Sequence, residues 1–195
     1  MATPKTENPD RTIARILKVN HAGEHGAIRI YTGQIRIATL TAPDLCDFLS
    51  ETRGHEIRHA DAFRRAMPAR KAHPCRAMWL WGIGGYALGM VTALLGRRAI
   101  WICTAAVEAR VHRHLAHQLR FLAHRDCELH DIIAGIRDEE EQHLAAARQA
   151  LGRPRALDRL LDAVIALSTE AVIWLSTNGD SRRMAREIAP NDTAS

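Results

Sequence analysis

The stretch Glu56-Ile57-Arg58-His59 decides the fold, because it returns 84 residues later as Glu140-Glu141-Gln142-His143. The same offset places Glu24 on Glu108. Residues three apart on an α-helix project from nearly the same side, so each Glu-x-x-His motif can present a carboxylate and an imidazole to one point. The repeat therefore predicts two similar halves, each made of a helix with one Glu, a turn, and a helix with Glu-x-x-His.

Apolar residues recur at helical spacing along most of the chain, and no segment alternates apolar and polar residues for long enough to predict a strand. Pro43 suits the first turn of a helix and Asp126 suits an N-cap, so these residues mark the start of the second helix in each half. The four helices are expected over about 12–40, 43–67, 97–123 and 127–151. Two such hairpins predict an all-α fold with a four-helix bundle at its centre.

Two further apolar helices are expected outside the bundle, at about 77–96 and 157–176. We expect one domain over residues 12–176, because a chain of this length can build a single core. The remaining residues, 1–11 and 177–195, are expected to be flexible tails.

The composition is that of an ordinary globular protein, with 47% hydrophobic and 25% charged residues in 195 positions. The net charge of +5 indicates affinity for an anionic surface without saying which one. The four cysteines are scattered singly, so they do not form the pattern of a zinc or disulfide framework. The sequence contains no phosphate-binding loop, nucleophilic triad or interleaving of aromatic and basic residues, and we expect no nucleic-acid partner.

Four carboxylates and two imidazoles are expected to meet inside the bundle. Glu24 and Glu56 lie at similar distances on either side of the Pro43 turn, so an antiparallel hairpin brings them to similar height, and the second half behaves in the same way. Four buried glutamates without counterions would repel one another strongly, and two divalent cations would cancel their charge. Carboxylate and imidazole ligands suit iron or manganese. The predicted ligands of this two-metal site are Glu24, Glu56, His59, Glu108, Glu140 and His143.

Several blocks of the sequence are similar to one known family. They are His21-Ala22-Gly23-Glu24-His25-Gly26-Ala27, Arg29-Ile30-Tyr31, Ala87-Leu88-Gly89, Thr92-Ala93-Leu94-Leu95-Gly96, Val107-Glu108 and Arg137-Asp138-Glu139-Glu140 with His143. Over about residues 11–175 the chain resembles the demethoxyubiquinone hydroxylases of ubiquinone biosynthesis. The resemblance implies a ferritin-like di-iron monooxygenase whose six ligands hold two Fe ions per chain. It also implies a demethoxyubiquinone-type polyprenyl benzoquinone as substrate, and NADH or another reductant as electron source.

The chain departs from this family's pattern at positions near the predicted ligands. The family usually has Tyr where His25 stands, a second Glu where Ala109 stands, and His-His-Tyr where Arg113-His114-Leu115 stands. The six ligand positions keep their residue types, while the hydrogen bonds around them are expected to differ.

Other patterns in the sequence suggest other functions. His55-Glu56-Ile57-Arg58-His59 also fits H-E-x-x-H, the zinc metalloprotease pattern in which both histidines bind zinc, although this leaves the repeat unexplained. Iron oxidation or storage would suit the same bundle. The stretch Gly82-Ile83-Gly84-Gly85-Tyr86-Ala87 fits a dinucleotide fingerprint, but no strand precedes it, so we interpret these glycines as close helix packing.

Residues 77–96 carry no charge, and the segment is long enough to cross a bilayer. A crossing would place the two halves of the metal site on opposite sides, so we expect either an interfacial helix or a bundle helix packed through its glycines. Residue types found at lipid headgroups are present as Trp79, Trp81, Trp101, Arg97 and Arg98. The expected location is cytoplasmic, in peripheral contact with the inner face of the cell membrane. A homo-oligomer or an accessory lipid-binding protein is left open as a further partner.

Overall fold

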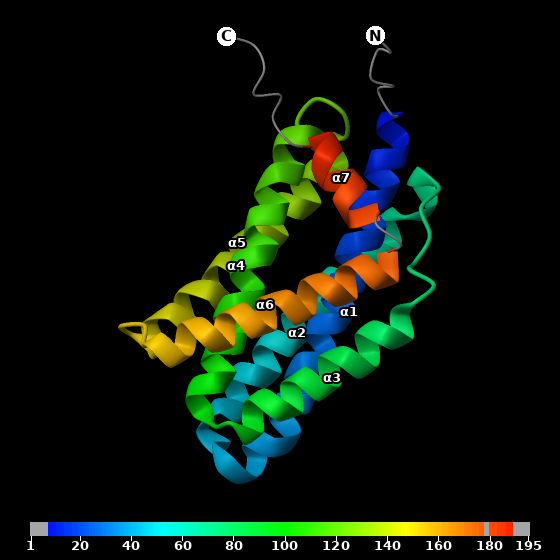
Figure 1. Cartoon of the computed structure of the whole chain (residues 1–195). Helices are drawn as coiled ribbons and strands as arrows, with labels where there is room; N and C mark the ends of the chain where they lie inside the picture. Colours follow the sequence, from blue (N-terminus) through cyan, green and yellow to red (C-terminus); the bar gives the residue numbers. More distant parts are fainter. Residues whose placement is uncertain (1–7, 178–179, 189–195) are drawn as a thin grey trace, which may run out of the picture.

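All secondary structure in the described part of the chain, residues 8–177 and 180–188, is helical in the computed structural model (Figure 1). The helices are α1 (Pro9–Thr41), α2 (Cys46–Ala66), α3 (Met78–Leu94), α4 (Arg97–Leu122), α5 (Cys127–Leu151), α6 (Ala156–Thr177) and α7 (Asp180–Ile188), with short 3-10 turns at Pro43–Leu45 and Pro68–Arg70. The all-α prediction is confirmed, and the two helices expected outside the bundle are α3 and α6. Most of the expected tail at 1–11 lies outside the described residues, but α1 already begins at Pro9.

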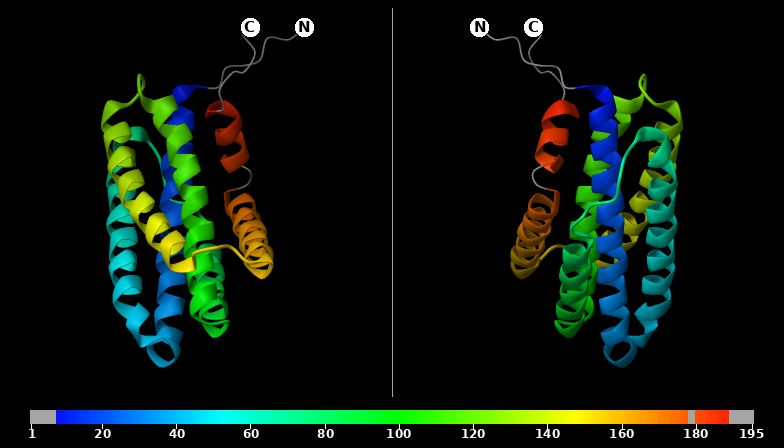
Figure 2. Two further views of the ribbon diagram at one scale, coloured as in Figure 1. Left: turned by 90° about the vertical axis from the view of Figure 1, so that its left-hand side faces the viewer. Right: turned by 90° about the vertical axis from the view of Figure 1, so that its right-hand side faces the viewer.

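Four helices form the central bundle as two hairpins. α1 packs against α2, and α4 packs against α5. α3 lies along α1, while α6 packs on α4 and crosses in front of the bundle (Figure 1). Figure 2 shows α6 and α7 on one side of the molecule and α2 and α5 on the opposite side. The largest apolar cluster joins α7 to the bundle and includes Ile16, Phe63 and Ile133.

Local signals in the sequence account for the start of each second helix. Pro43 occupies the first position of the 3-10 turn that leads into α2, where its missing N–H is not needed. Asp126 caps α5 by accepting a hydrogen bond from the Leu129 N–H at 3.0 Å. Arg70 donates to both oxygens of the same carboxylate, at 2.6 and 2.7 Å. The predicted cap is confirmed, and it also ties the end of the first hairpin to the turn of the second.

Glycines let α1 and α3 approach closely. A Cβ atom added at Gly33 would lie 2.5 Å from the Tyr86 carbonyl oxygen, and one added at Gly85 would lie 2.6 Å from the Gly26 carbonyl oxygen. Any larger residue at these positions would force the helix backbones apart. The interpretation of residues 82–87 as close helix packing is confirmed.

The chain after residue 177 differs from the expected tail. Residues 180–188 form α7, in which Met184 and Ile188 are buried in the main apolar cluster. The Glu187 carboxylate accepts a hydrogen bond from Arg15 of α1 at 2.7 Å. The segment is polar overall, but its two buried residues stand four apart and share one helix face. Residues 189–195 of the expected tail lie outside the described residues.

α6 buries only part of its apolar surface. Ile165 and Ala166 are buried, and Ile165 packs with residues of α1 and α4. Four other apolar side chains of this helix are exposed: Leu157, Leu160, Val164 and Leu167. The apolar pattern therefore marks two faces of α6, of which one covers the bundle and the other lies open.

α3 has a similar division. Its glycine-rich side packs on α1, whereas Trp79, Ile83, Val91 and Leu94 are exposed. Of the three tryptophans expected at a lipid boundary, Trp81 is buried and Trp101 packs on Phe48 with ring centroids 4.6 Å apart, so Trp79 alone is well exposed. Within residues 8–177 and 180–188, no helix combines the length and the apolar character needed to span a membrane.

Candidate metal centre

The six predicted ligands meet in the middle of the bundle, and each of these residues is at most 4% exposed. α1 and α4 contribute one residue each, and α2 and α5 contribute two each. The six residues form two groups, and within each group the potential ligand atoms lie within 4.8 Å of one another. The first group is Glu24, Glu56, His59 and Glu140, and the second is Glu56, Glu108, Glu140 and His143. Glu56 and Glu140 belong to both groups. The structure therefore brings every predicted ligand into two neighbouring positions that share two carboxylates.

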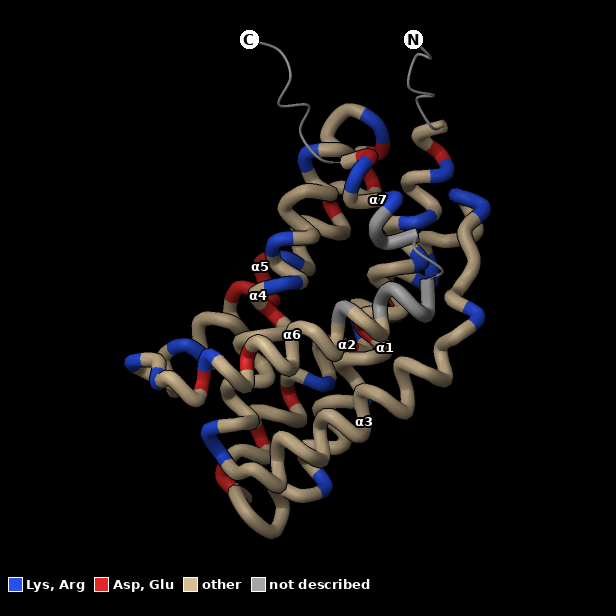
Figure 3. The backbone as a smooth tube through the Cα atoms, viewed as in Figure 1, with Lys and Arg blue, Asp and Glu red and all other residues tan. Residues whose placement is uncertain are grey.

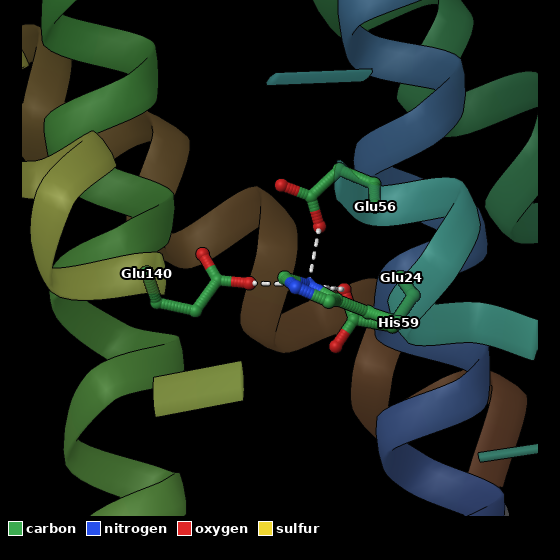
Figure 4. Close-up of side chains that lie close together, drawn as sticks. All are labelled: Glu24, Glu56, His59 and Glu140. Atoms are coloured by element: carbon green, nitrogen blue, oxygen red, sulfur yellow. Dashed lines mark ion pairs between the residues drawn. The ribbon is translucent and has the colours of Figure 1, made fainter. Parts of the chain in front are cut away.

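The first position is centred on His59 (Figure 4). Its Nδ1 atom lies 3.1 Å from Glu140 Oε1, 3.7 Å from Glu56 Oε2 and 4.0 Å from Glu24 Oε2. Glu56 and His59 stand three residues apart on α2, so helix geometry alone brings them together. Carboxylates from three different helices thus converge on one imidazole nitrogen.

The second position has the same construction around His143. Its Nδ1 atom lies 3.4 Å from Glu140 Oε2 and 3.6 Å from Glu56 Oε1. Both predicted ligand histidines therefore turn Nδ1 toward the carboxylates of the predicted ligand set.

Tyr31 of α1 supports the second position from inside the bundle. Its hydroxyl donates a hydrogen bond to Glu108 Oε1 at 2.6 Å. Burial, together with the charge of Glu108, raises the pKa of the phenol well above its usual value, so the hydroxyl stays protonated and remains a donor. Tyr31 was not among the residues predicted from the sequence, although its place seven residues after Glu24 puts both residues on one face of the helix.

Burial sets the charge state of the cluster. It raises the pKa values of Glu24, Glu56 and Glu108, because a carboxylate in the protein interior loses its hydration. Burial opposes charge on Glu140 and His59 too, but close contacts with groups of opposite charge outweigh it, so the pKa of Glu140 falls and that of His59 rises to about 10. Protons therefore hold the carboxylates together when no cation does, and a metal ion must displace them.

The donor set fits two cations. Among the described residues, Glu56 Oε1, Glu140 Oε1 and both ring nitrogens of His59 are buried and take part in no hydrogen bond of ordinary geometry. Buried polar atoms are nearly always satisfied, and the inward-facing orphaned atoms, Glu56 Oε1, Glu140 Oε1 and His59 Nδ1, are those that a bound cation would satisfy. Carboxylate oxygens and imidazole nitrogens suit iron and manganese, and neither group contains a cysteine. The cluster is therefore a candidate two-metal centre.

On the side of the centre formed by α2 and α5, two further residues contact the predicted ligand histidines, and neither was predicted from the sequence as a partner of those histidines. His55 Nδ1 lies 2.9 Å from His143 Nε2, and Glu139 Oε2 lies 3.4 Å from His59 Nε2. Within the described residues His55 joins neither ligand group, because its ring stacks on the outer edge of His143. The metalloprotease interpretation, which needs His55 and His59 on one zinc ion, is therefore not supported. The same 84-residue offset relates His55 to Glu139, and this was the signal that could have found the pair.

A cavity of about 330 Å³ lies on the opposite side of the centre. Residues of α1, α3, α4, α6 and α7 line it, and it reaches Glu24, Glu56 and Glu108. Most of its wall is apolar and includes Trp81 and Leu88. A hydrophobic molecule in this cavity would therefore lie directly beside the carboxylates.

Comparison with known proteins finds similar sequences over nearly all of the helical region. The family model described as "Ubiquinone biosynthesis protein COQ7" matches residues 11–176, which include all six predicted ligands. A Mus musculus protein named "NADPH-dependent 3-demethoxyubiquinone 3-hydroxylase, mitochondrial" is 34% identical over 168 residues, covering 84% of this chain and 76% of the relative. A Rhodospirillum rubrum protein named "3-demethoxyubiquinol 3-hydroxylase" is 33% identical over 178 residues, covering 89% and 81%. A Saccharomyces cerevisiae protein named "5-demethoxyubiquinone hydroxylase, mitochondrial" is 36% identical over 111 residues, covering 57% and 48%.

Proposed function

Because this chain belongs to the ubiquinone biosynthesis protein COQ7 family, we propose that it is a di-iron monooxygenase that hydroxylates the ring of a demethoxyubiquinone-type polyprenyl benzoquinone. The observation that carries the proposal is the meeting of six ligands from four helices beside an apolar cavity. The three relatives described above are all named hydroxylases, and no observation favours iron storage.

Two iron ions would supply the activation of O₂ and the transfer of one oxygen atom to the ring. The chain's own residues provide position: Glu24 and His59 would hold one ion, Glu108 and His143 the other, with Glu56 and Glu140 in reach of both. Since the ligands stand on four packed helices, the packing of the bundle sets the spacing of the two positions.

The cavity determines which molecules reach the centre. Its apolar wall favours a hydrophobic ring and limits the access of bulk water to the carboxylates. Trp81 is held at this wall against Gly26, where an added Cβ would lie 2.7 Å from the indole ring. We place the quinone ring in this cavity, with its isoprenoid tail leaving between α3 and α6.

The reaction also needs a source of electrons. Hydroxylation inserts one atom of O₂ into a ring C–H bond and releases the other as water, which consumes two electrons and two protons. A reduced nicotinamide, NADH or NADPH, is our proposed donor, and the name of the mouse relative specifies NADPH. Residues 82–87 are not its binding site, because Gly85 of that segment packs directly on the α1 backbone.

Turnover of iron-loaded protein with a short-tailed demethoxyubiquinone under ¹⁸O₂ tests the proposal. The expected product carries one ¹⁸O atom in a new ring hydroxyl. Glu56→Ala removes a carboxylate shared by both positions and should abolish the product, whereas Glu51→Ala, which removes an exposed carboxylate from the same helix, should not. Product without ¹⁸O, or undiminished product from Glu56→Ala, would contradict the proposal.

We also propose that α3 and α6 form a membrane-binding face of a cytoplasmic protein attached peripherally to the inner face of the cell membrane. Exposed apolar side chains gather on these neighbouring helices: Trp79, Ile83, Val91 and Leu94 on α3, and Leu157, Leu160, Val164 and Leu167 on α6. Figure 3 shows that α3 carries no Lys, Arg, Asp or Glu along its length. Because the same two helices line the cavity, a polyprenyl quinone would pass from the bilayer to the centre without crossing water.

Co-sedimentation with phospholipid vesicles tests this face. The double variant Leu160→Glu with Leu167→Glu should bind vesicles at least about tenfold more weakly, since each buried leucine contributes about 1.5–3 kcal/mol. Leu40→Glu is the matched control, because Leu40 is 86% exposed but lies near the end of α1. Equal loss in both proteins, or in neither, would contradict the proposal. Gel filtration of the same variants shows whether a second copy of the chain covers this face instead.

A further inference from the structure

The residues that precede the two Glu-x-x-His motifs reach across the bundle to each other's histidine. Glu139 of α5 faces His59 of α2, with Oε2 3.4 Å from Nε2. His55 of α2 faces His143 of α5, with Nδ1 2.9 Å from Nε2. His55 and Glu139 occupy equivalent places in the repeat. The two contacts are therefore halves of one pseudo-symmetric arrangement with different chemistry in each half.

Metal binding assigns the protons in this arrangement. Both ligand histidines turn Nδ1 inward, 3.1 Å from a Glu140 oxygen for His59 and 3.4 Å for His143. A nitrogen that binds a cation carries no proton, so each neutral ring keeps its proton on the outward Nε2. That N–H needs an acceptor. The Glu139 carboxylate, 3.4 Å from His59 Nε2, is the group placed to accept it there, and the Nδ1 of His55, 2.9 Å from His143 Nε2, is placed to accept it at His143.

We infer that Glu139 and His55 are positioning residues for the two ligand imidazoles, and that their difference in charge makes the two metal positions unequal. A carboxylate acceptor raises the basicity of the imidazole that it holds and adds negative charge close to the cation, whereas a neutral imidazole adds none. The position with His59 therefore binds a divalent cation more tightly than the position with His143. This inference rests on the proposed two-metal function.

Neighbouring groups do not cancel this difference. Arg58 donates to Glu139 at 3.4 Å, but its side chain is 61% exposed, so solvent screens its charge while the contact keeps the carboxylate in place. Tyr31 orients Glu108 at the second position, but its hydroxyl is neutral. The Glu139 Oε2 atom also lies 3.5 Å from His55 Nδ1, but it contacts the His59 imidazole directly, whereas the His55 ring stands between it and His143. Glu139 is thus the charged group in direct contact with the outer side of His59.

Titration of metal-free protein with Co²⁺, followed by calorimetry and by visible absorption, tests the inference. The wild-type protein should bind two ions in two separate steps. Glu139→Ala should weaken the tighter step by about 10–100-fold, and His55→Ala should weaken the other step by a smaller factor, because it removes an acceptor that carries no charge. Glu139→Gln keeps an acceptor without the charge, so its effect should be smaller than that of Glu139→Ala. Asp138→Asn, which alters an adjacent and exposed carboxylate, should change neither step.

Proton NMR of the Co²⁺-loaded protein provides a readout that general damage to the fold would not give. The wild-type protein should show two exchangeable, strongly shifted imidazole N–H signals. Glu139→Ala should accelerate solvent exchange of one signal and His55→Ala of the other. Equal affinities in the wild-type protein, or equal weakening of both steps by each variant, would overturn the inference alone. Failure of the wild-type protein to bind Co²⁺ would refute the proposed centre itself.

Discussion

Replacing Gly33 by alanine tests whether the close approach of α1 and α3 holds the bundle in its observed arrangement. A Cβ atom at this position would lie 2.5 Å from the Tyr86 carbonyl oxygen and 3.0 Å from the Met90 nitrogen, which are both backbone atoms of α3. Backbone atoms cannot turn aside as a flexible side chain can, so α3 must move away from α1 as a unit. Tyr31, the partner of a ligand carboxylate, lies only two residues away on α1.

The expected loss follows from two opposing contributions. Overpacking against a backbone costs about 3 kcal/mol, the upper end of the usual range, and exchange of glycine for alanine inside a helix returns about 1 kcal/mol. The free energy of unfolding should therefore fall by about 2 kcal/mol, which lowers Tm by about 4–8 °C in a chain of this size. The control is Gly135→Ala on α5, where a Cβ atom would meet nothing within 4 Å.

Circular dichroism melts and urea denaturation of metal-free protein provide the assay. Gly135→Ala should raise Tm by about 2–4 °C, because it gains helix propensity without a clash. If Gly33→Ala melts at or above the wild-type temperature, the close backbone contact is not a constraint on the fold. If both variants lower Tm equally, the loss does not come from the contact between α1 and α3.

Three further predictions concern the centre and its supports. Tyr31→Phe removes the hydroxyl that donates to Glu108, and it should weaken Co²⁺ binding by about tenfold or more in a calorimetric titration; unchanged affinity would remove Tyr31 from the support of the site. Asp126→Ala removes the N-cap of α5 and should lower the free energy of unfolding by about 1–2 kcal/mol in urea denaturation, unlike alanine at an exposed aspartate within a helix. In EDTA, Tm should fall as the pH rises from about 6.5 to about 10, because the folded state raises the pKa of His59 from 6.5 to about 10 and raises the pKa values of Glu24 and Glu108 well above 4.5. The stabilisation is complete below the unfolded-state pKa values and is lost as the pH rises through the folded-state ones. A Tm that stays constant or rises over this range would show that these groups are not buried together.

The sequence predicted the central bundle and its six candidate ligands because both follow from short-range geometry. Spacing along a helix determines direction, so Glu56 and His59 must share a face wherever the helix lies. Prolines, glycines and Asp126 mark the helix ends because their backbone preferences act locally. The repeat then extended one local pattern to two halves of the chain, and the structure brings those residues together.

Features that depend on how distant elements pack could not be predicted from the sequence. His55 precedes a ligand on its helix, but only the placement of α5 decides that it meets His143. α7 is short and mostly polar, and packing of Met184 and Ile188 against the bundle accompanies its helical form. The pattern of α6 shows which residues are apolar, but it does not say that Leu167 faces outward and Ile165 inward. Such contacts are long-range, and their signal in one sequence is weak.

Anaerobic titration of the metal-free protein with Fe²⁺, with iron counted by elemental analysis after removal of free metal, tests the two-metal centre most directly. The wild-type chain should saturate at about two iron ions and melt at a higher temperature when loaded, since binding to the folded state alone stabilises it. Glu56→Ala, which removes a carboxylate shared by both positions, should retain at most one ion. Saturation of the wild-type chain at one ion or none, with no change in Tm, would contradict the account.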